Sequence, residues 1–437
     1  MYELYGDGTV AFQWTLEIAL PLVGLAILLL LTVPVWVSIG YAALAMVYFG
    51  DRVPVGLVGE SVFEGINHFA LIAVPLYVLT GDALVRSGLS RKLLDIAEAT
   101  MGSLRSGLGT STVLGCGLFS CISGSDAAGA AAVGRITHGR LVERGYPPPY
   151  AGALVASGAC TGILIPPSIA YIIIGLVLGL PVSTLFIAAL IPGVLILGSV
   201  MTVNVLMNMV YGYEDNATRF SFRRWLHTVW DGRYAILIPF IILGGIYSGI
   251  FTPTEAAAVA VVTTIVVGLS QRTITMADFP KMLESSAKVC GIIIPIIAVS
   301  LPLAQALAVV DMPEGLSSTL TTYLESPITI ILLMLVVFMI AGCVMEATPN
   351  IVILAPIMLP IAQEIGMHPI HFSVFMITTL GIGFITPPLG LNLFILASLT
   401  GQSVLAIAAR AIPFVALMVV AALVIALVPM LSLWPLG

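Results

Sequence analysis

Charged residues are scarce in this chain. Only 9% of its 437 residues are Asp, Glu, Lys or Arg, whereas soluble domains carry about a quarter. Hydrophobic residues make up 59%, and the mean hydropathy is +1.12. A soluble protein of this length could not cover its surface with so few charges. The composition therefore predicts a polytopic membrane protein and excludes disordered, fibrous and disulfide-scaffold classes.

Several functional signatures are also missing. The net charge is -6 and there is no basic tract, which excludes nucleic-acid binding. None of the five cysteines belongs to a C-x-x-C pair, so we expect buried apolar side chains rather than a metal or redox site. The sequence contains no G-x-x-x-x-G-K-[ST], H-E-x-x-H or G-x-S-x-G pattern. These absences argue against ATP-driven transport and against an intramembrane hydrolase.

Apolar runs predict the membrane spans. A bilayer core of about 30 Å needs about 20 apolar residues per helix. Regions 106–134 and 328–363 are interrupted by polar residues, glycine or proline at Ser123–Asp126 and Glu346–Pro349, and each arm is too short to cross comfortably. We therefore predict two re-entrant hairpins, each buried in protein or lining a cavity. The other candidate spans are 15–32, 33–50, 67–84, 148–180, 186–211, 234–250, 254–270, 289–310, 370–400 and 411–434.

The cationic residues predict the orientation, because Lys and Arg gather in short cytoplasmic loops. If both hairpins return to the side they entered from, all 16 cationic residues except Arg52 fall on one side. The first hairpin then opens to the cytoplasm and the second to the outside, with both termini outside. Stretches 88–101 and 314–325 are predicted as amphipathic helices lying along the two interfaces.

The two halves of the chain resemble each other. Glu143-Arg144-Gly145 and Glu364-Ile365-Gly366 lie 221 positions apart, and the same offset places Gly162–Pro167 on Gly383–Pro388. Combined with the orientation, this predicts two inverted-topology repeats joined by a polar cytoplasmic linker at 212–233. Inverted repeats with broken helices are typical of secondary transporters.

Four interruptions, two in each half, carry the predicted chemistry. They are the hairpin tips at 123–126 and 346–350 and the Pro-Pro breaks at 165–168 and 386–388. Proline removes a backbone donor and clashes with the preceding turn, so two in succession should unwind a helix. A kink repaired by neighbouring helices is the alternative, but it explains less well why Pro-Pro recurs in both halves. Freed carbonyls and hydroxyls suit Na⁺, and half-helix N-termini suit an anionic substrate.

The candidate ion- and substrate-binding residues are Ser123, Gly124, Ser125, Asp126, Pro166, Pro167, Ser168, Glu346, Thr348, Pro349, Asn350, Gly383, Thr386, Pro387, Pro388 and Asn392. By the pseudo-symmetry, each half should offer one Na⁺ pocket built from its own hairpin tip and Pro-Pro break. We place one pocket near Ser123 and Ser125 and the other near Thr348 and Thr386.

Two carboxylates stand at the tips, and an ionisable group at membrane depth is a functional candidate. The alternative is that each reaches a hydrated mouth and only keeps a loop soluble. For Asp126 the two interpretations weigh equally, whereas the longer apolar arm before Glu346 favours function. His368 and His371 have helical spacing, but no further ligand clusters with them, so we expect a solvated outside loop rather than a metal site.

The segment Gly245–Ala256, with the sequence GIYSGIFTPTEA, strongly resembles a signature of the large membrane (permease) subunit of TRAP transporters, the tripartite ATP-independent periplasmic transporters. Phe119–Ser125, Gly162–Ser168 and Ile385–Asn392 are similar to three further motifs of that family. The resemblance covers essentially the whole chain in the family's order. Two residues depart from its pattern: Asp126 stands where many relatives have a small hydroxyl residue, and Glu346 stands where Asp is familiar.

The resemblance implies a non-enzymatic importer in the bacterial or archaeal cytoplasmic (inner) membrane. Such proteins carry carboxylate-bearing solutes with Na⁺, without a cofactor, by an elevator motion of a transport domain against a scaffold. Their partners are a small four-helix membrane subunit and a soluble periplasmic substrate-binding protein. The resemblance implies the following division: scaffold helices and a cytoplasmic arm at 1–105, half of the transport domain at 106–211 (hairpin 106–134, broken helix 148–180), the linker at 212–233, scaffold helices and a periplasmic arm at 234–327, and the other half of the transport domain at 328–437 (hairpin 328–363, broken helix 370–400).

Two other functions stay open at this point. A self-sufficient Na⁺/carboxylate symporter of related inverted-repeat fold would work without partners. A membrane-embedded hydrolase or transferase would need a catalytic base near a nucleophile, and the deep segments contain no convincing pair. Dicarboxylates, sugar acids and compatible solutes all remain candidate cargoes.

Overall fold

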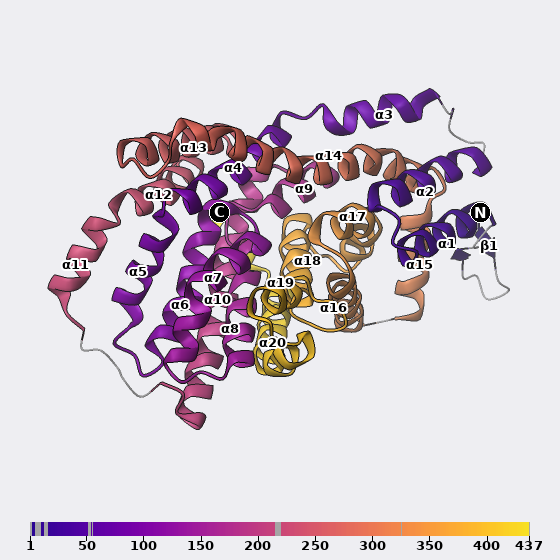
Figure 1. Cartoon of the computed structure of the whole chain (residues 1–437). Helices are drawn as coiled ribbons and strands as arrows, with labels where there is room; N and C mark the ends of the chain where they lie inside the picture. Colours follow the sequence, from indigo (N-terminus) through magenta and orange to yellow (C-terminus); the bar gives the residue numbers. More distant parts are fainter. Residues whose placement is uncertain are drawn as a thin grey trace.

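Helices make up nearly all of this computed structural model (Figure 1), which describes residues 2–4, 10–12, 16–50, 54, 56–214, 220–324 and 326–436. A short antiparallel strand pair, β1 (Tyr2–Leu4) with β2 (Val10–Phe12), lies at the N-terminal end. The predicted all-α class is confirmed, with this strand pair as a small addition.

Six helical segments are long and apolar enough to cross a membrane, and the bent pair Phe222–Asp231 and Arg233–Tyr247 gives up to seven. This confirms a polytopic membrane protein. One of the six is α16 (Pro327–Val344), an arm of the second predicted hairpin. At 1.5 Å per residue its 18 residues extend about 27 Å. The prediction that each arm is too short to cross is therefore wrong for α16.

One group of helices runs along the upper edge in Figure 1. It contains α4 (Ala73–Arg86), which packs on both α13 (Pro253–Ser270) and α14 (Phe279–Val309). α13 begins with a capping box in which Thr252 and Glu255 satisfy each other's backbone N–H groups, followed by Pro253 at the first helical position. The group is completed by α1 (Leu16–Leu30), α2 (Val35–Gly50), α3 (Gly56–Ile66) and α12 (Arg233–Tyr247).

A second group contains the two helical hairpins and the two helices broken at Pro-Pro. From the first half come α6 (Gly107–Ser123), α7 (Asp126–Glu143), α8 (Pro148–Ala159), α9 (Ile169–Leu178) and α10 (Val182–Tyr211). From the second half come α16, α17 (Ala347–Glu364), α18 (Pro369–Gly383), α19 (Leu391–Thr400), α20 (Val404–Leu427) and α21 (Met430–Leu433). The halves interlock, because α17 packs on α9 and α19 packs on α7 and α8.

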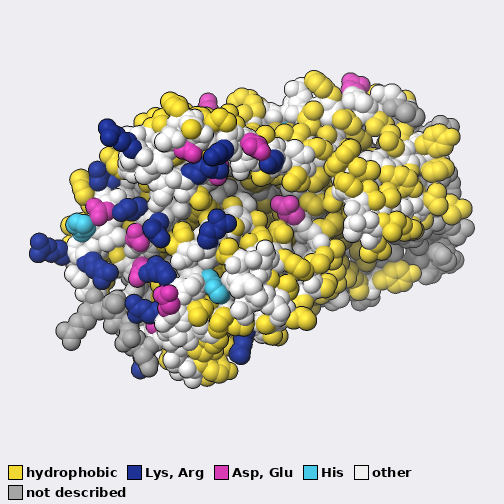
Figure 2. All heavy atoms as spheres, in the orientation of Figure 1, with side chains coloured by type: hydrophobic (Ala, Val, Ile, Leu, Met, Phe, Trp, Pro, Cys, Tyr) yellow, Lys and Arg dark blue, Asp and Glu magenta, His cyan; other side chains and the backbone are white. Residues whose placement is uncertain are grey.

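Three amphipathic helices border these groups. The predicted stretches 88–101 and 314–325 form α5 (Leu89–Met101), which packs on α6, and α15 (Met312–Tyr323), which packs on α17. The segment 212–233, predicted as a polar linker, also contains a helix, α11 (Phe222–Asp231). Lys and Arg side chains gather at the end of the molecule that carries α5 and α11, and hydrophobic side chains cover the opposite end (Figure 2).

The structure confirms the expectation that the cysteines are buried and contradicts the expectation that His371 is solvated. Cys116, Cys160, Cys290 and Cys343 are buried and Cys121 is partly buried, as predicted. His371, however, is 1% exposed, with Nδ1 3.1 Å from the Ser432 hydroxyl and Nε2 3.1 Å from the Ala426 carbonyl. His368 accepts a hydrogen bond from the Ile370 N–H at the start of α18. The expected solvated loop is wrong for His371, because it faces the C-terminal helices.

Candidate transport site

The first hairpin turns at Gly124, which has a left-handed backbone with φ of 61°. A Cβ at this position would lie 2.8 Å from the Pro167 carbonyl oxygen. The Gly124 carbonyl accepts a hydrogen bond from the Ile169 N–H at 3.2 Å. The tip of the first hairpin therefore touches the first Pro-Pro break directly, and only glycine fits there.

The first Pro-Pro break interrupts a largely buried helix. α8 ends at Ala159, a 3-10 turn covers Cys160–Ile163, and α9 begins at Ile169 after the cis Pro166–Pro167 bond. The Ser168 hydroxyl donates to the Ile163 carbonyl at 2.8 Å. A Cβ on Gly162 would lie 2.7 Å from the Asp126 nitrogen, so the turn abuts the N-terminus of α7. The structure thus unwinds this helix where the sequence predicted it.

The second break lies between α18 and α19, and it has a different environment. Pro387 and Pro388, joined by a cis bond, are exposed, whereas Pro166 and Pro167 are buried.

The second break contacts α16. The Gly390 N–H donates to the Cys343 carbonyl at 3.1 Å, which joins this break to α16. α16 and α18 also approach closely, since a Cβ on Gly383 would lie 2.6 Å from the Gly342 Cα. The Thr386 hydroxyl donates to the Ile382 carbonyl at 2.9 Å.

A cavity of about 450 Å³ brings the two hairpin tips together. Ser123–Asp126 lines it from one tip, and Glu346–Thr348 lines it from the other. Its remaining wall comes from the first turns of α7 and, on the opposite side, from α4 and α14, which contribute Gly81 and Ser285 among other residues. Neither Pro387 nor Pro388 belongs to the lining. Of the predicted site residues, those at the two hairpin tips line this cavity together. The residues predicted at the two Pro-Pro breaks, and Pro349, Asn350 and Asn392, are not part of its lining.

The cavity is acidic inside. Asp126 is 3% exposed, and its Oδ2 has no hydrogen-bond partner among the described residues. Glu346 is exposed to the cavity and has no ion-pair partner in that part of the chain. Arg135 lies exposed in the wall, and Asp82 is held by Arg86 at 2.9 Å. The solvated-loop interpretation fits the exposure of Glu346 but not the burial of Asp126.

Buried acceptor oxygens without partners lie near the tips. Asn350 donates from Nδ2 to the Ala341 and Met345 carbonyls, each at 3.0 Å, and its Oδ1 has no described partner. Asn392 is fully buried beside the Asp126 carboxylate, and its Oδ1 has no hydrogen-bond partner among the described residues. Buried polar groups are usually satisfied, so these oxygens are available to a ligand or water. Their all-oxygen chemistry fits a hard cation such as Na⁺.

The sequence did not predict that residues of α4 and α14 line the cavity. Gly81 approaches the first tip so closely that a Cβ on it would lie 3.1 Å from the Ser123 Cβ. A single glycine or serine within an apolar helix carries no pattern that marks such a contact. Among the described residues, no group of three His, Cys, Asp or Glu side chains could hold a metal ion.

Broken helices around a cavity, in a chain with several helices long and apolar enough to cross a membrane, are typical of secondary transporters. The family model described as "Tripartite ATP-independent periplasmic transporter, DctM component" matches residues 22–431. The chain therefore belongs to the DctM family of TRAP transporter large permease subunits.

Individual TRAP transporter permeases are also similar to this chain along most of its length. The C4-dicarboxylate TRAP transporter large permease protein DctM of Pseudomonas aeruginosa is 38% identical over 374 residues, covering 85% of this chain and 87% of the relative. The isethionate TRAP transporter permease protein DctMQ of Oleidesulfovibrio alaskensis is 31% identical over 94% of this chain, which spans only 65% of that longer protein. The 2,3-diketo-L-gulonate TRAP transporter large permease protein YiaN of Escherichia coli is 32% identical over 79% of this chain and 81% of its own length.

Among solved structures, the YdaH transporter of Alcanivorax borkumensis matches with a TM-score of 0.55 and 14% identity. The match covers 86% of this chain and 87% of that one. At this identity the likeness concerns the fold alone.

Proposed function

We propose that the chain imports an organic carboxylate together with Na⁺, as the large subunit of a binding-protein-dependent transporter. The observation that carries this proposal is the single cavity lined by both hairpin tips, with unpartnered oxygens on Asp126, Asn350 and Asn392 at or near them. The named cargoes of the three relatives, isethionate, C4-dicarboxylates and 2,3-diketo-L-gulonate, are all organic anions. Isethionate is a sulfonate, whereas C4-dicarboxylates and 2,3-diketo-L-gulonate are carboxylates, and the carboxylate is the cargo class we assign.

The charge of the cavity supports coupling to a cation. An anionic cargo would meet Asp126 and Glu346, with Arg135 as the cation in the same lining. Co-bound Na⁺ would offset this repulsion, and the N-termini of α7 and α17 at the tips add partial positive charge. We place one Na⁺ near Ser123 and Ser125, and another near Thr348 and Thr386.

We further propose an elevator motion of two inverted repeats. The moving part comprises 106–211 and 328–437, and the scaffold comprises 1–105 and 234–327. The cavity supports this division, because its lining combines both hairpin tips with α4 and α14. On this proposal the partners are a small four-helix membrane subunit and a periplasmic binding protein. The protein lies in the inner membrane with both termini periplasmic.

The Na⁺ dependence of uptake tests the proposal. We expect Ser123→Ala, Thr348→Ala and Thr386→Ala each to remove one oxygen ligand, at a cost of roughly 1–3 kcal/mol. The Na⁺ concentration for half-maximal uptake should rise about tenfold or more, since 1.4 kcal/mol is a factor of ten. Asp126→Asn should also shift it. Thr202→Ala is the matched control, because this exposed hydroxyl only bonds the Gly198 carbonyl of its own helix.

The assay uses vesicles containing the complete transporter, at fixed membrane potential and fixed binding-protein concentration. Unchanged Na⁺ dependence in all four site variants, or uptake by the parent on a proton gradient alone, would show that these are not Na⁺ sites.

A further inference from the structure

Helix α11 carries an apolar face that nothing in the described chain covers. Phe222, Leu226 and Trp230 follow one another at four-residue intervals and are 64%, 53% and 67% exposed. None of the residues of α11 is buried. Four-residue spacing puts the three side chains on one face of the helix. An exposed apolar stripe of this kind marks a surface that meets a partner or a membrane.

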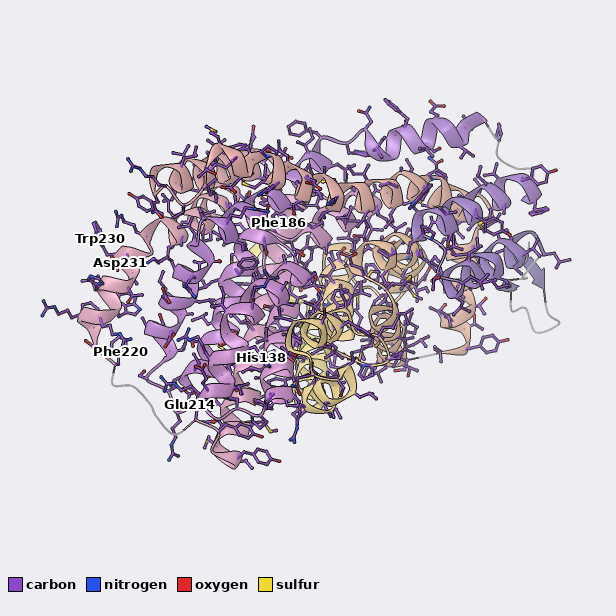
Figure 3. The ribbon with its side chains drawn as sticks, viewed as in Figure 1. His138, Phe186, Glu214, Phe220, Trp230 and Asp231 are labelled. Carbon is purple, nitrogen blue, oxygen red and sulfur yellow. The ribbon has the colours of Figure 1, made fainter. Side chains whose placement is uncertain are left out.

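The direction of α11 suits a membrane surface. The helix is bent by 70° from α12, which continues directly into the apolar segment Arg233–Tyr247. If α12 follows the membrane normal, α11 lies nearly in the membrane plane. Figure 3 shows Phe220, just before α11, and Trp230, near the other end of α11, on the periphery of the molecule. Trp230 also receives the Arg233 guanidinium over its ring, at 4.9 Å from the centroid.

A polar pocket of about 530 Å³ lies beside this helix, between α5, the end of α7 and α11. Lys92, Arg140, Arg144 and Arg224 line it, together with the acidic residues Asp95, Glu98 and Asp231. Glu98 is paired with Arg140 at 2.6 Å, Asp231 lies 3.2 Å from His227, and Asp95 lies near Lys92. Arg144 and Arg224 are exposed and have no ion-pair partner in the described parts of the chain.

The pocket and the apolar stripe are continuous. Trp225 lines the pocket, stacks on Phe222 of the stripe at 5.8 Å between centroids, and donates from Nε1 to the Thr100 hydroxyl of α5 at 3.1 Å. Phe220 lines the pocket as well and is 55% exposed. Two unpaired guanidinium groups thus stand next to an exposed aromatic surface.

We propose that this pocket and the stripe together bind an anionic phospholipid of the cytoplasmic leaflet. Arg144 and Arg224 hold its phosphate, since guanidinium groups match phosphate oxygens in charge and geometry. Its acyl chains run along Phe222, Leu226 and Trp230, with α11 embedded at the headgroup level. A free phosphate compound would use the arginines but would leave the stripe exposed. The bound lipid would link α5, α7 and α11.

Native mass spectrometry of the full-length chain in detergent tests the headgroup site. The probes are phosphatidylglycerol and phosphatidylcholine with identical acyl chains. We expect the parent to prefer phosphatidylglycerol, and Arg144→Gln with Arg224→Gln to weaken its binding about tenfold or more. Arg91→Gln is the matched control, because Arg91 is exposed on the same helix as Lys92 but does not line the pocket. Equal binding of both lipids by the parent, or an unchanged double variant, overturns the proposal.

Two further measurements identify the source of the phosphate and the place of the stripe. Glycerol 3-phosphate should not displace phosphatidylglycerol; displacement would assign the site to a soluble phosphate compound instead. In bilayer nanodiscs, brominated phosphatidylglycerol should quench tryptophan fluorescence less in Trp230→Phe than in the parent. Equal quenching would mean that the stripe faces water or another protein. Thermal melting of each variant confirms that it is folded.

Discussion

At the scale of single residues, two separate features make position 124 suitable only for glycine. Its positive φ would strain any other residue, and a Cβ would collide with the Pro167 carbonyl. Gly179 offers a matched comparison, because its φ is 66° but nothing lies within 4 Å of its Cβ position. The left-handed backbone alone costs roughly 1–2 kcal/mol.

We therefore expect Gly124→Ala to destabilise the protein clearly more than Gly179→Ala, and to reduce uptake, because the hairpin tip must shift. Thermal unfolding in detergent, compared for the two variants, measures the difference. If both variants melt at the same temperature, the tip does not rest against the Pro-Pro break as described.

Glu214 forms a buried contact at the base of the first hairpin, just after α10 (Figure 3). It is 4% exposed and accepts hydrogen bonds from the Leu108 N–H, at 3.1 and 3.0 Å to its two oxygens, and from the Tyr146 hydroxyl at 3.0 Å. Burial raises the pKa of the Glu214 carboxyl, although these hydrogen bonds and nearby Arg144 lower it in part. The segment after α10 is thereby joined to the start of α6.

Because the pKa of Glu214 is raised in the folded state, its contribution to stability is complete below the ordinary Glu pKa of about 4.3. That contribution is lost as the pH rises through the raised pKa. We expect the free energy of unfolding of Glu214→Gln to fall less across this window than that of the parent. Glu364→Gln, an exposed carboxylate at the end of α17, serves as the control. Parallel pH profiles for Glu214→Gln and the parent would contradict this prediction.

At the scale of the helical elements, the contact between α4 and the first hairpin tip tests whether the two groups of helices move. A double variant Gly81→Cys with Ser123→Cys, in a background without other cysteines, should form a disulfide, because the two Cβ positions lie close together. If uptake requires the tip to slide past α4, oxidation should abolish uptake at saturating Na⁺, and reduction should return it to the level of the never-oxidised double variant.

A cross-link inside the proposed moving part provides the control. Gly158→Cys would place its Cβ 3.2 Å from the sulfur of native Cys116, joining α8 to α6. This disulfide should leave uptake largely intact. Full uptake with the α4 cross-link in place would contradict the elevator proposal.

The sequence predicts the elements of this site better than its surroundings. Pro-Pro pairs and the run Ser123–Asp126 interrupt apolar segments, so the breaks and tips could be located from residue chemistry alone. The two Pro-Pro breaks share a motif but differ in burial, because that depends on packing by distant helices. The burial of His371 likewise depends on Ser432, far along the chain. The apolar face of α11 was not predicted, because the adjacent Arg223 and Arg224 interrupt its apolar residues in the sequence.

At the scale of the whole molecule, the distribution of Lys and Arg predicts the orientation in the membrane. Single cysteines at 139 and 223 should react with an impermeant thiol reagent only from the cytoplasm. Cysteines at 60 and 364 should react only from outside. All four positions are exposed in the structure. Labelling of position 139 from outside would mean that α6 and α7 do not return to the side they entered from, and the proposed inverted repeats would fail.

The dependence on partners is the last prediction at this scale. Both hairpin tips and the cavity belong to the described membrane helices, whereas the strand pair and α11 are too small to capture a solute from dilute solution. We therefore expect the purified chain alone in liposomes to show negligible Na⁺-driven uptake. Adding a cognate small membrane subunit and binding protein should restore it. The chain with the small subunit alone is the control, because it separates stabilisation of the scaffold from delivery of cargo. Robust, saturable uptake by the chain alone would instead establish a self-sufficient Na⁺/carboxylate symporter, since capture and translocation would then reside in the same helices.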